Sequence, residues 1–448
     1  MSRTVPALVV AAVMMLASAG GPSAAVRPPK LQYDIAKLDN GLTVILSEDH
    51  STPIVHVALW YHVGSKNERP GRTGFAHLFE HMMFKGSKNV DPEAHTSFIS
   101  SVGGQTNAYT TDDETVFWET VPAQYMPLAL WLEADRMASL RINEATFANE
   151  REVVKEERRM RVDNQPFGRL NEIIYDHAFT VHPYKHPTIG SMADLEAASI
   201  ADVREFHATY YVPENATLTL VGDFETPQAK QLVEKYFGRV PKAPKPVPRD
   251  IAQEPPQTEE RRITLEQPWP LPAVVVAHHI TYDGHPDSYP LHIAAKVLSD
   301  GQSSRIYQKL VYEQQLAVAA FGQANLIEQP NLFYAVAIVQ PGRKPEDAIS
   351  ALIAELDRMK SEPISEHELQ RTKNQFARDY LLSRDSNQQK ALHLAHAAVI
   401  HNDITTADGE FDIFTKVSTA DVQRVARTYF NQSNRVVLHI LPRAGGSR

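Results

Sequence analysis

The sequence predicts an α+β protein of two homologous domains of similar size, each a mainly antiparallel sheet with helices packed on it. A chain of 448 residues with 43% hydrophobic content exceeds what one core usually organises. A proline-rich stretch at residues 241–260 is unsuited to a helix or central strand. The order of predicted strands and helices before this stretch recurs after it. We therefore expect domains at 31–240 and 261–443, a linker at 241–260 and a tail at 444–448.

The N-terminal 25 residues are typical of a secretory signal peptide. Arg3 precedes an apolar run from Val5 to Ala17, and small residues continue through Ala25. The run is shorter than the roughly 20 apolar residues that a membrane span needs, and it lacks the arginine-rich amphipathic character of a mitochondrial presequence. We expect a cleaved signal peptide at 1–25, a periplasmic or secreted protein and no stable membrane span.

Composition excludes several classes of function. The formal charge of −9 argues against nucleic acid as the main partner. The chain has no cysteine, so it can have neither a disulfide framework nor a thiol nucleophile.

Both halves alternate strand and helix patterns. In the first half, a hairpin turns at Asp39-Asn-Gly41. The other first-half segments are predicted as strands at 54–61, 106–111, 115–121 and 216–221, and as helices across 123–177 with breaks near Ile142 and Pro166, at 200–210 and at 226–237. In the second half we expect strands at 262–265, 273–281, 317–325, 332–339 and 436–441, and helices at 289–298, across 346–400 and before the last strand. The second half therefore repeats the first.

The segment from Gly74 to Phe84 carries the chemistry. A helix here places His77, Glu80, His81 and Phe84 on one side, and it places Phe75, Leu78, Phe79 and Met82 on the other. His-x-x-Glu-His puts two imidazoles at i and i+4, with a carboxylate beside any water on a bound metal. The alternative is a core-packed helix whose histidines only form hydrogen bonds.

A catalytic zinc site needs a third ligand. In the helix around residues 150–160, helical phase places Val153, Val154, Glu157 and Arg161 on the same face as Glu150, whereas Glu152, Lys155, Glu156 and Arg159 project away. Phase therefore selects Glu157 over Glu156 as the donor. The alternative is a buried Glu157–Arg161 ion pair at i+4, which this helix alone supports equally.

These motifs, His77-Leu-Phe-Glu-His81 and Glu150-Arg-x-Val-Val-x-x-Glu157, resemble those of the pitrilysin and insulinase zinc peptidases. The chain is similar to half-size bacterial members and to the mitochondrial processing peptidase β subunit over nearly its whole mature length. The resemblance implies one Zn²⁺ held by His77, His81 and Glu157, with Glu80 as general base on zinc-bound water and Glu150 as a supporting acidic residue. It also implies half of a clamshell.

The segment from Gly103 to Thr110 looks like the family's substrate-binding edge strand, with Asn107 and Ala108 at its centre. A peptide could add to such an edge through main-chain hydrogen bonds. The alternative is an ordinary strand after a glycine turn.

The remaining histidines have no carboxylate partner at ligand spacing, so we expect surface or core roles for them. They include His278, His279, His393, His396 and His401.

The second half departs from the family pattern. Complete enzymes of the family have an arginine and a tyrosine where this chain has Val311 and Val318. We therefore expect a heterodimer in which a homologous subunit without zinc ligands supplies both groups, so that the two chains enclose a chamber.

The resulting prediction is a zinc metalloendopeptidase subunit that hydrolyses peptides or short unfolded polypeptides. The alternatives are a non-catalytic peptide-binding or scaffold subunit of the same fold, which would not need all four site residues, and a solute-binding protein with an incidental metal site.

Overall fold

The computed structural model describes residues 27–443. The predicted signal peptide at residues 1–25 and the predicted tail at residues 444–448 lie outside the described residues. Residues 27–31 contain neither helix nor strand and belong to a separate unit, and the folded unit begins at Gln32. No helix within residues 27–443 combines the length and apolar character that a membrane crossing needs.

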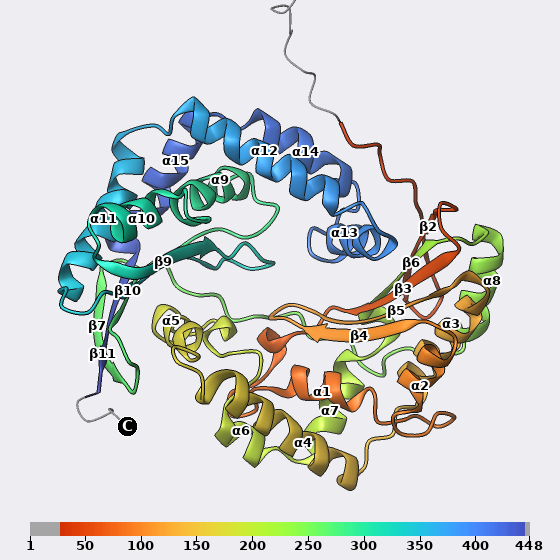
Figure 1. The fold of residues 1–448 in the computed structure, drawn as a ribbon. Coiled ribbons are helices and arrows are strands. Elements are labelled where there is room, and N and C mark those ends of the chain that lie inside the picture. The colour runs from red at the N-terminus through yellow and green to blue at the C-terminus, as the bar shows by residue number, and fades with distance from the viewer. Residues whose placement is uncertain (1–26, 444–448) are drawn as a thin grey trace, which may run out of the picture. The chain divides into compact units, whose positions relative to one another are not determined.

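The first half of the folded unit forms a six-stranded sheet in the order β1-β2-β6-β3-β5-β4 (Figure 1). The predicted hairpin is present as an antiparallel β1–β2 pair, and β2 pairs with β6 in parallel. The last strand, β4, pairs only with β5 among the described strands and is an edge. The strands are β1 (Asp34–Lys37), β2 (Thr43–Glu48), β3 (Ile54–Tyr61), β4 (Gln105–Thr110), β5 (Thr115–Pro122) and β6 (Ala216–Gly222).

The second half forms a five-stranded sheet in the order β7-β11-β8-β10-β9. Its parallel pair is β7–β11, and its other pairs are antiparallel, so it repeats the first sheet without β1. The edge strand β9 corresponds to β4. The predicted repeat of one α+β arrangement is therefore confirmed. The strands are β7 (Arg261–Gln267), β8 (Ala273–His279), β9 (Ala317–Ala324), β10 (Leu332–Val339) and β11 (Arg435–Pro442).

Helices flank both sheets. In the first half they are α1 (Phe75–Met82), α2 (Ala94–Ser101), α3 (Met126–Ser139), α4 (Glu144–Arg158), α5 (Leu170–Ala178), α6 (Met192–Ala197), α7 (Ile200–Tyr210) and α8 (Thr226–Phe237). In the second half they are α9 (Ser288–Ser299), α10 (Arg305–Tyr307), α11 (Pro345–Ser361), α12 (Glu366–Leu382), α13 (Asn387–Val399), α14 (Thr406–Lys416) and α15 (Thr419–Tyr429). Two π-helical turns, η3 (Arg159–Asp163) and η6 (Gln308–Glu313), extend α4 and α10. The helices α2, α6, α10 and α14 are not predicted from the sequence.

The face of α1 opposite its histidines is buried in the first core, as predicted, through Phe75, Leu78, Phe79 and Met82. The phase predicted for α4 is partly wrong. Val154 and Glu150 are buried, but Val153 is 42% exposed and the side chain of Lys155 is buried. Because α4 packs on both α1 and α6, its buried face is turned toward residues 154, 155 and 158.

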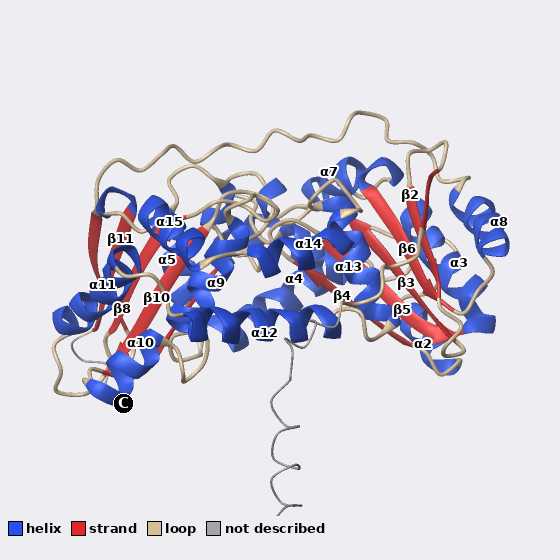
Figure 2. Cartoon of the chain, turned by 90° about the horizontal axis from the view of Figure 1, so that it is seen from above, coloured by secondary structure: helices blue, strands red, loops and turns tan. Residues whose placement is uncertain are grey.

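The two halves contact one another within the folded unit. Helix α13 of the second half packs on β3 and β6 of the first, as both ribbon views show (Figures 1 and 2). Ala395 of α13 shares a small apolar cluster with Ala58, Trp60 and Val116. A helix of the second half therefore covers part of the sheet of the first half. Residues 241–260 contain neither helix nor strand, as expected of a linker, and the exact domain boundaries stay a prediction.

The junction also contains a buried charge network. Lys66 bonds to Asp113 at 2.8 Å and to Glu328, which lies between β9 and β10. His62 lies 2.6 Å from the same Glu328 carboxylate.

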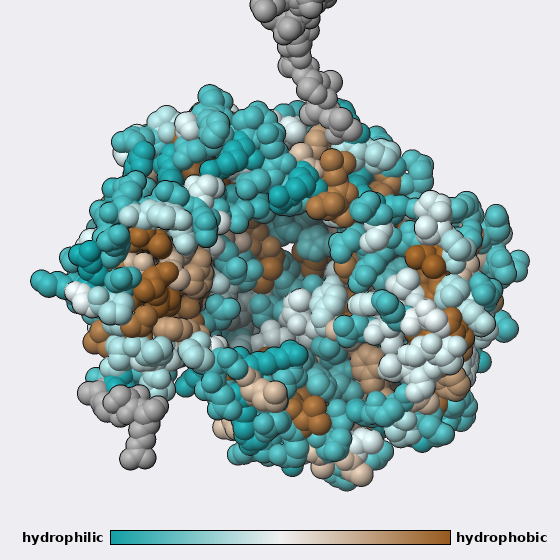
Figure 3. Space-filling model, viewed as in Figure 1, coloured by the Kyte–Doolittle hydropathy of each residue, from teal (hydrophilic) through white to brown (hydrophobic). Residues whose placement is uncertain are grey.

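The face of the molecule in Figure 3 is mostly hydrophilic, and apolar surface gathers where β9 and its neighbours lie. Exposed large apolar side chains of that region are Tyr312, Val318 and Phe321.

Candidate metal centre

The N-terminus of α1 is held by groups outside the helix. Gly74, the residue before α1, has a φ of 90°. The buried carboxylate of Glu68 accepts hydrogen bonds of 2.8 Å from the backbone N–H groups of Gly74 and Ala76, which have no partner inside the helix. Gly190 approaches so closely that a β-carbon there would lie 2.5 Å from the nitrogen of Gly74. These contacts set where His77 and His81 project.

His77, His81 and Glu157, the three proposed ligands, converge from α1 and α4. Glu157 Oε2 lies 3.4 Å from His81 Nε2 and 3.7 Å from His77 Nε2. Tetrahedral zinc with ligand bonds of about 2.0–2.2 Å separates its donor atoms by about 3.4 Å. The donor types and spacing therefore fit zinc. Glu156, the carboxylate that helical phase rejects, is exposed and pairs with Arg159.

Glu157 also forms the ion pair of the alternative interpretation, but at the surface rather than buried, because the Arg161 side chain is 76% exposed. Its second oxygen, Oε1, lies 2.6 Å from Arg161 Nη1, one turn along the chain. The two interpretations are compatible because each uses a different oxygen of the carboxylate. Arg161 thereby orients Oε2 toward the histidines.

Glu150 lies behind His81, on the side away from the three converging donors. Its Oε2 is 3.7 Å from His81 Nδ1, and its Oε1 accepts from Asn149 at 2.7 Å and pairs with Lys85 at 3.2 Å. A carboxylate beside the outer nitrogen of an imidazole favours a proton there and leaves the inner nitrogen free to bind a metal. This position suits the supporting role expected of Glu150. His77 has no such neighbour among the described residues, since its buried Nδ1 is unpartnered.

Glu80 is anchored by a residue that the sequence analysis did not single out. The hydroxyl of Thr110, at the end of β4, donates a 2.6 Å hydrogen bond to Glu80 Oε2. Burial raises the pKa of Glu80, while this hydrogen bond and the nearby His81 oppose the increase. The signal that could have identified Thr110 is its place at the end of the predicted strand, next to the motif helix.

Asn107 and Ala108 lie on edge strand β4, which packs beside α1. Asn107 is exposed, and its side-chain oxygen accepts a 2.9 Å hydrogen bond from the N–H of Ala108. The side-chain oxygen of Asn107 is thus occupied locally, and β4 also offers its backbone edge at this point.

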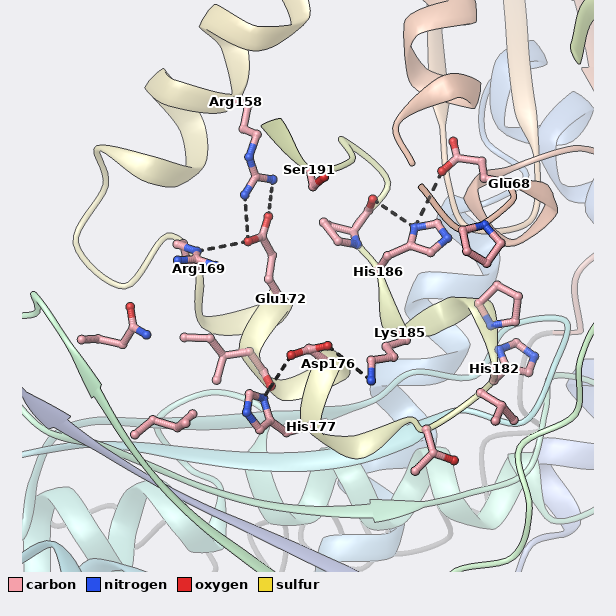
Figure 4. A pocket seen from close by; sticks show the side chains of 18 residues that line it. Glu68, Arg158, Arg169, Glu172, Asp176, His177, His182, Lys185, His186 and Ser191 are labelled. Carbon is pink, nitrogen blue, oxygen red and sulfur yellow. Dashed lines mark hydrogen bonds and ion pairs between the residues drawn. The ribbon is translucent and has the colours of Figure 1, made fainter. Parts of the chain in front are cut away.

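A large cavity lies next to the candidate metal centre and contains none of its predicted residues (Figure 4). It measures about 610 Å³, and its charged side chains are largely paired with one another. Arg158, the neighbour of Glu157, binds both carboxylate oxygens of Glu172 at 2.5 and 3.0 Å. Asp176 lies 3.5 Å from Lys185. Arg158 also donates to the carbonyl of Gly190 at 2.6 Å, so it links α4 to the segment that abuts the start of α1.

The expectation that the other histidines lack a carboxylate partner is wrong for several of them. His50, His62 and His95 lie 2.7, 2.6 and 2.9 Å from a carboxylate oxygen, and two further histidines share one carboxylate. His396 Nε2 and His401 Nε2 lie 2.8 and 3.1 Å from Asp283 Oδ2. Asp283 is 113 residues from His396 in the sequence, which is why spacing does not reveal the pair. His278 is a core residue as expected, buried with both ring nitrogens unpartnered among the described residues.

Two family models match the chain. Residues 43–191 match the model described as insulinase, peptidase family M16, and residues 197–376 match the model described as the peptidase M16 inactive domain. The candidate metal centre lies wholly in the first matched segment.

Curated relatives extend over nearly the whole chain. A protein named zinc protease PqqE from Helicobacter pylori is 30% identical over 414 residues, covering 92% of this chain and 93% of the relative. The mitochondrial-processing peptidase subunit beta of Lentinula edodes is 25% identical, covering 88% of this chain and 87% of its own.

Solved structures have the same fold. A protease from Helicobacter pylori superposes with a TM-score of 0.88 at 30% identity, covering 92% of this chain and all of the other. The first half of the periplasmic protease PqqL from Escherichia coli superposes with a TM-score of 0.74 at 18% identity, covering 93% of each chain. The matched models and the long 30% identical relative together show that this chain belongs to peptidase family M16.

Proposed function

We propose that the chain is a zinc metalloendopeptidase subunit in which His77, His81 and Glu157 hold one Zn²⁺. The observation that carries this proposal is the convergence of two imidazole nitrogens and one carboxylate oxygen at 3.4 and 3.7 Å, with Glu80 beside them on the same helix. A non-catalytic scaffold would not require both this donor set and a carboxylate poised next to it.

A bound zinc ion supplies Lewis acidity, which lowers the pKa of a water molecule toward neutrality and polarises a carbonyl group. Glu80 accepts the proton of the attacking water and passes it to the leaving amine. The hydrogen bond from Thr110 holds the Glu80 carboxylate in one orientation for both transfers. Because Thr110 ends β4, a peptide aligned on that edge strand, past Asn107 and Ala108, would run toward Glu80.

A partner subunit completes this proposal. The positions where complete enzymes of the family have arginine and tyrosine hold Val311, half-buried against the second core, and Val318, 45% exposed on β9. Neither side chain can donate a hydrogen bond to a peptide. A homologous chain with those two groups would supply them, and the processing-peptidase relative is itself named as a subunit. An exported heterodimer acting on short unfolded chains is the function we propose.

The test separates proton transfer from metal binding. Glu80→Gln keeps the size of the side chain but cannot accept the proton, so we expect peptide turnover to fall at least about 100-fold with zinc content unchanged. Glu156→Gln is the matched control, because Glu156 is exposed on α4 and faces away from the histidines. Retained turnover by a fully zinc-loaded Glu80→Gln variant would reject Glu80 as the base.

The partner is tested by purification from the native source. We expect a homologous chain to co-purify and peptide cleavage to drop when the two are separated. An isolated chain that cleaves at the same rate as the co-purified material would contradict the heterodimer.

A further inference from the structure

The second cluster of metal-ligating side chains lies at the junction of the two halves, on elements that the proposed function does not use. Asp283 lies in the loop between β8 and α9, His396 near the end of α13 and His401 in the turn before α14. The nearest ligand atoms of the three residues all lie within 4.8 Å of one another. The three side chains therefore converge although they come from separate segments.

Asp283 is oriented by its own loop. Its Oδ1 accepts from the N–H of Gly284 at 2.9 Å, and its backbone N–H donates to the carbonyl of Ile327 at 2.8 Å. Oδ2 is left facing both imidazoles, at 2.8 Å from His396 Nε2 and 3.1 Å from His401 Nε2. The loop thus presents one carboxylate oxygen to two ring nitrogens.

The outer nitrogen of His401 has a partner that suits a metal ligand. His401 Nδ1 lies 2.8 Å from the hydroxyl of Thr406, and that hydroxyl donates to the backbone carbonyl of Asp403 at 2.8 Å. Since the Thr406 proton points to the carbonyl, its oxygen accepts the proton of Nδ1. A neutral His401 then has its lone pair on Nε2, facing Asp283, which is the arrangement typical of a metal-binding histidine.

The surroundings of the cluster are negative. Glu410 of α14 and Glu114 of the β4–β5 turn both act electrostatically on His396. Burial raises the pKa of Glu410, and the charge of Asp283 raises it further. Asp283, Glu114 and Glu410 would each attract a positive charge placed between the rings and Asp283.

We propose that Asp283, His396 and His401 form a second binding site for a divalent first-row metal ion, with zinc as the expected occupant. Two imidazoles and a carboxylate suit zinc and its neighbours better than calcium or magnesium, which prefer oxygen. The donors now lie at hydrogen-bond distances, and a metal requires them to separate by about 0.3–0.6 Å to reach about 3.4 Å. The side chain of His396 is 40% exposed, against 21% for Asp283 and 4% for His401, so His396 is the ligand that would shift.

The proposed ion would tie α13 to the loop that carries Asp283. Helix α13 packs on β3 and β6 of the first half, whereas the Asp283 loop is bonded to Ile327, beside the Glu328 that binds Lys66. An ion bound to both segments would fix α13 against this loop. Its role is therefore structural, at the junction of the halves, and it does not depend on the proposed hydrolysis at Glu80.

Metal stoichiometry tests the site without reference to activity. Full-length variants would be dialysed against Zn²⁺ and analysed for zinc per chain by mass spectrometry, and titrated with Co²⁺ to follow its visible absorption. We expect two equivalents in the unaltered chain and one in His77→Ala/His81→Ala. We also expect one in His396→Ala/His401→Ala and none when all four histidines are replaced. His367→Ala, on the exposed face of α12, is the matched control and should leave two equivalents.

The conservative variant Asp283→Asn guards against misfolding, because it keeps the shape of the side chain and its hydrogen bond to Gly284. In the His77→Ala/His81→Ala background, we expect Zn²⁺ to raise the melting temperature, and we expect Asp283→Asn to abolish that increase while far-ultraviolet circular dichroism stays unchanged. If the His77→Ala/His81→Ala variant retains no zinc, the cluster of Asp283, His396 and His401 binds no metal ion and the proposal is overturned. A His396→Ala/His401→Ala variant that retains as much metal as the unaltered chain would overturn it equally. If only the site on α1 fails to bind zinc, the unaltered chain would contain one equivalent of zinc, and His77→Ala/His81→Ala would contain the same amount.

Discussion

Replacing Gly190 with alanine tests whether the placement of α1 depends on the close approach of two backbone segments. Gly190 has a φ of 75°. A β-carbon there would lie 2.4 Å from the carbonyl oxygen of Thr73 and 2.5 Å from the nitrogen of Gly74, where ordinary contact begins near 3.4 Å. Both neighbours are backbone, so the two segments must separate by about 1 Å.

Two contributions set the size of the effect. The left-handed conformation costs an alanine roughly 1–2 kcal/mol, and forcing a methyl group into a packed contact typically costs about 1–3 kcal/mol. We expect the free energy of unfolding to fall by about 2–5 kcal/mol in total. Gly71→Ala is the control, because Gly71 has a φ of 78° and nothing within 4 Å of the added carbon. It should show only the conformational cost.

Urea denaturation of both variants measures the difference, and peptide turnover reports its effect on the site. A shift of about 1 Å at the start of α1 displaces His77, and a misplacement of that size can reduce turnover about 100-fold. The reasoning is refuted if Gly190→Ala is no less stable than Gly71→Ala, since the close approach would then have no energetic weight.

Three further predictions concern Glu80 and the junction of the halves. Thr110→Val removes the hydroxyl that donates to Glu80, so we expect turnover to fall roughly 10- to 100-fold with zinc content unchanged; loss of zinc would instead indicate a structural role. Lys66→Met leaves the buried Asp113 and Glu328 carboxylates without their cation and should lower the free energy of unfolding by about 3–5 kcal/mol, whereas Lys309→Met on the surface should change little. Burial alone would raise the pKa of Glu328, but hydrogen bonds and charges from His62 and Lys66 hold it at about 2. Because the pKa of Glu328 is lower in the folded than in the unfolded chain, where it is about 4.3, the ionised carboxylate stabilises the fold above about pH 4.3. This contribution to the free energy of unfolding is about 3 kcal/mol, and it is lost as the pH falls toward about 2. Urea titrations between pH 5 and pH 3 should therefore show a shallower loss of stability for Glu328→Gln, and an unchanged slope would contradict this assignment.

Much of the local structure could be predicted from periodicity. The bounds of α7 and α8 and of strand β10 agree with the residues where their patterns begin and end. The buried face of α1 was also predicted, because its apolar residues recur at helical spacing. Where packing involves two neighbours at once, periodicity is insufficient. The pairing of Lys155 with Glu196 of α6 buries a residue that phase placed in solvent.

The sequence by itself determined that the chain alternates strands and helices in two similar halves and that one helix presents two histidines and a glutamate. Those features follow from residues within a few turns of one another. Only the tertiary structure decided that Glu157 meets those histidines with one oxygen while Arg161 takes the other, that Thr110 reaches Glu80, and that Asp283 faces two histidines more than a hundred residues away. The physical reason is that local spacing specifies which face a side chain occupies, whereas the packing of whole elements specifies which side chains from distant faces come together.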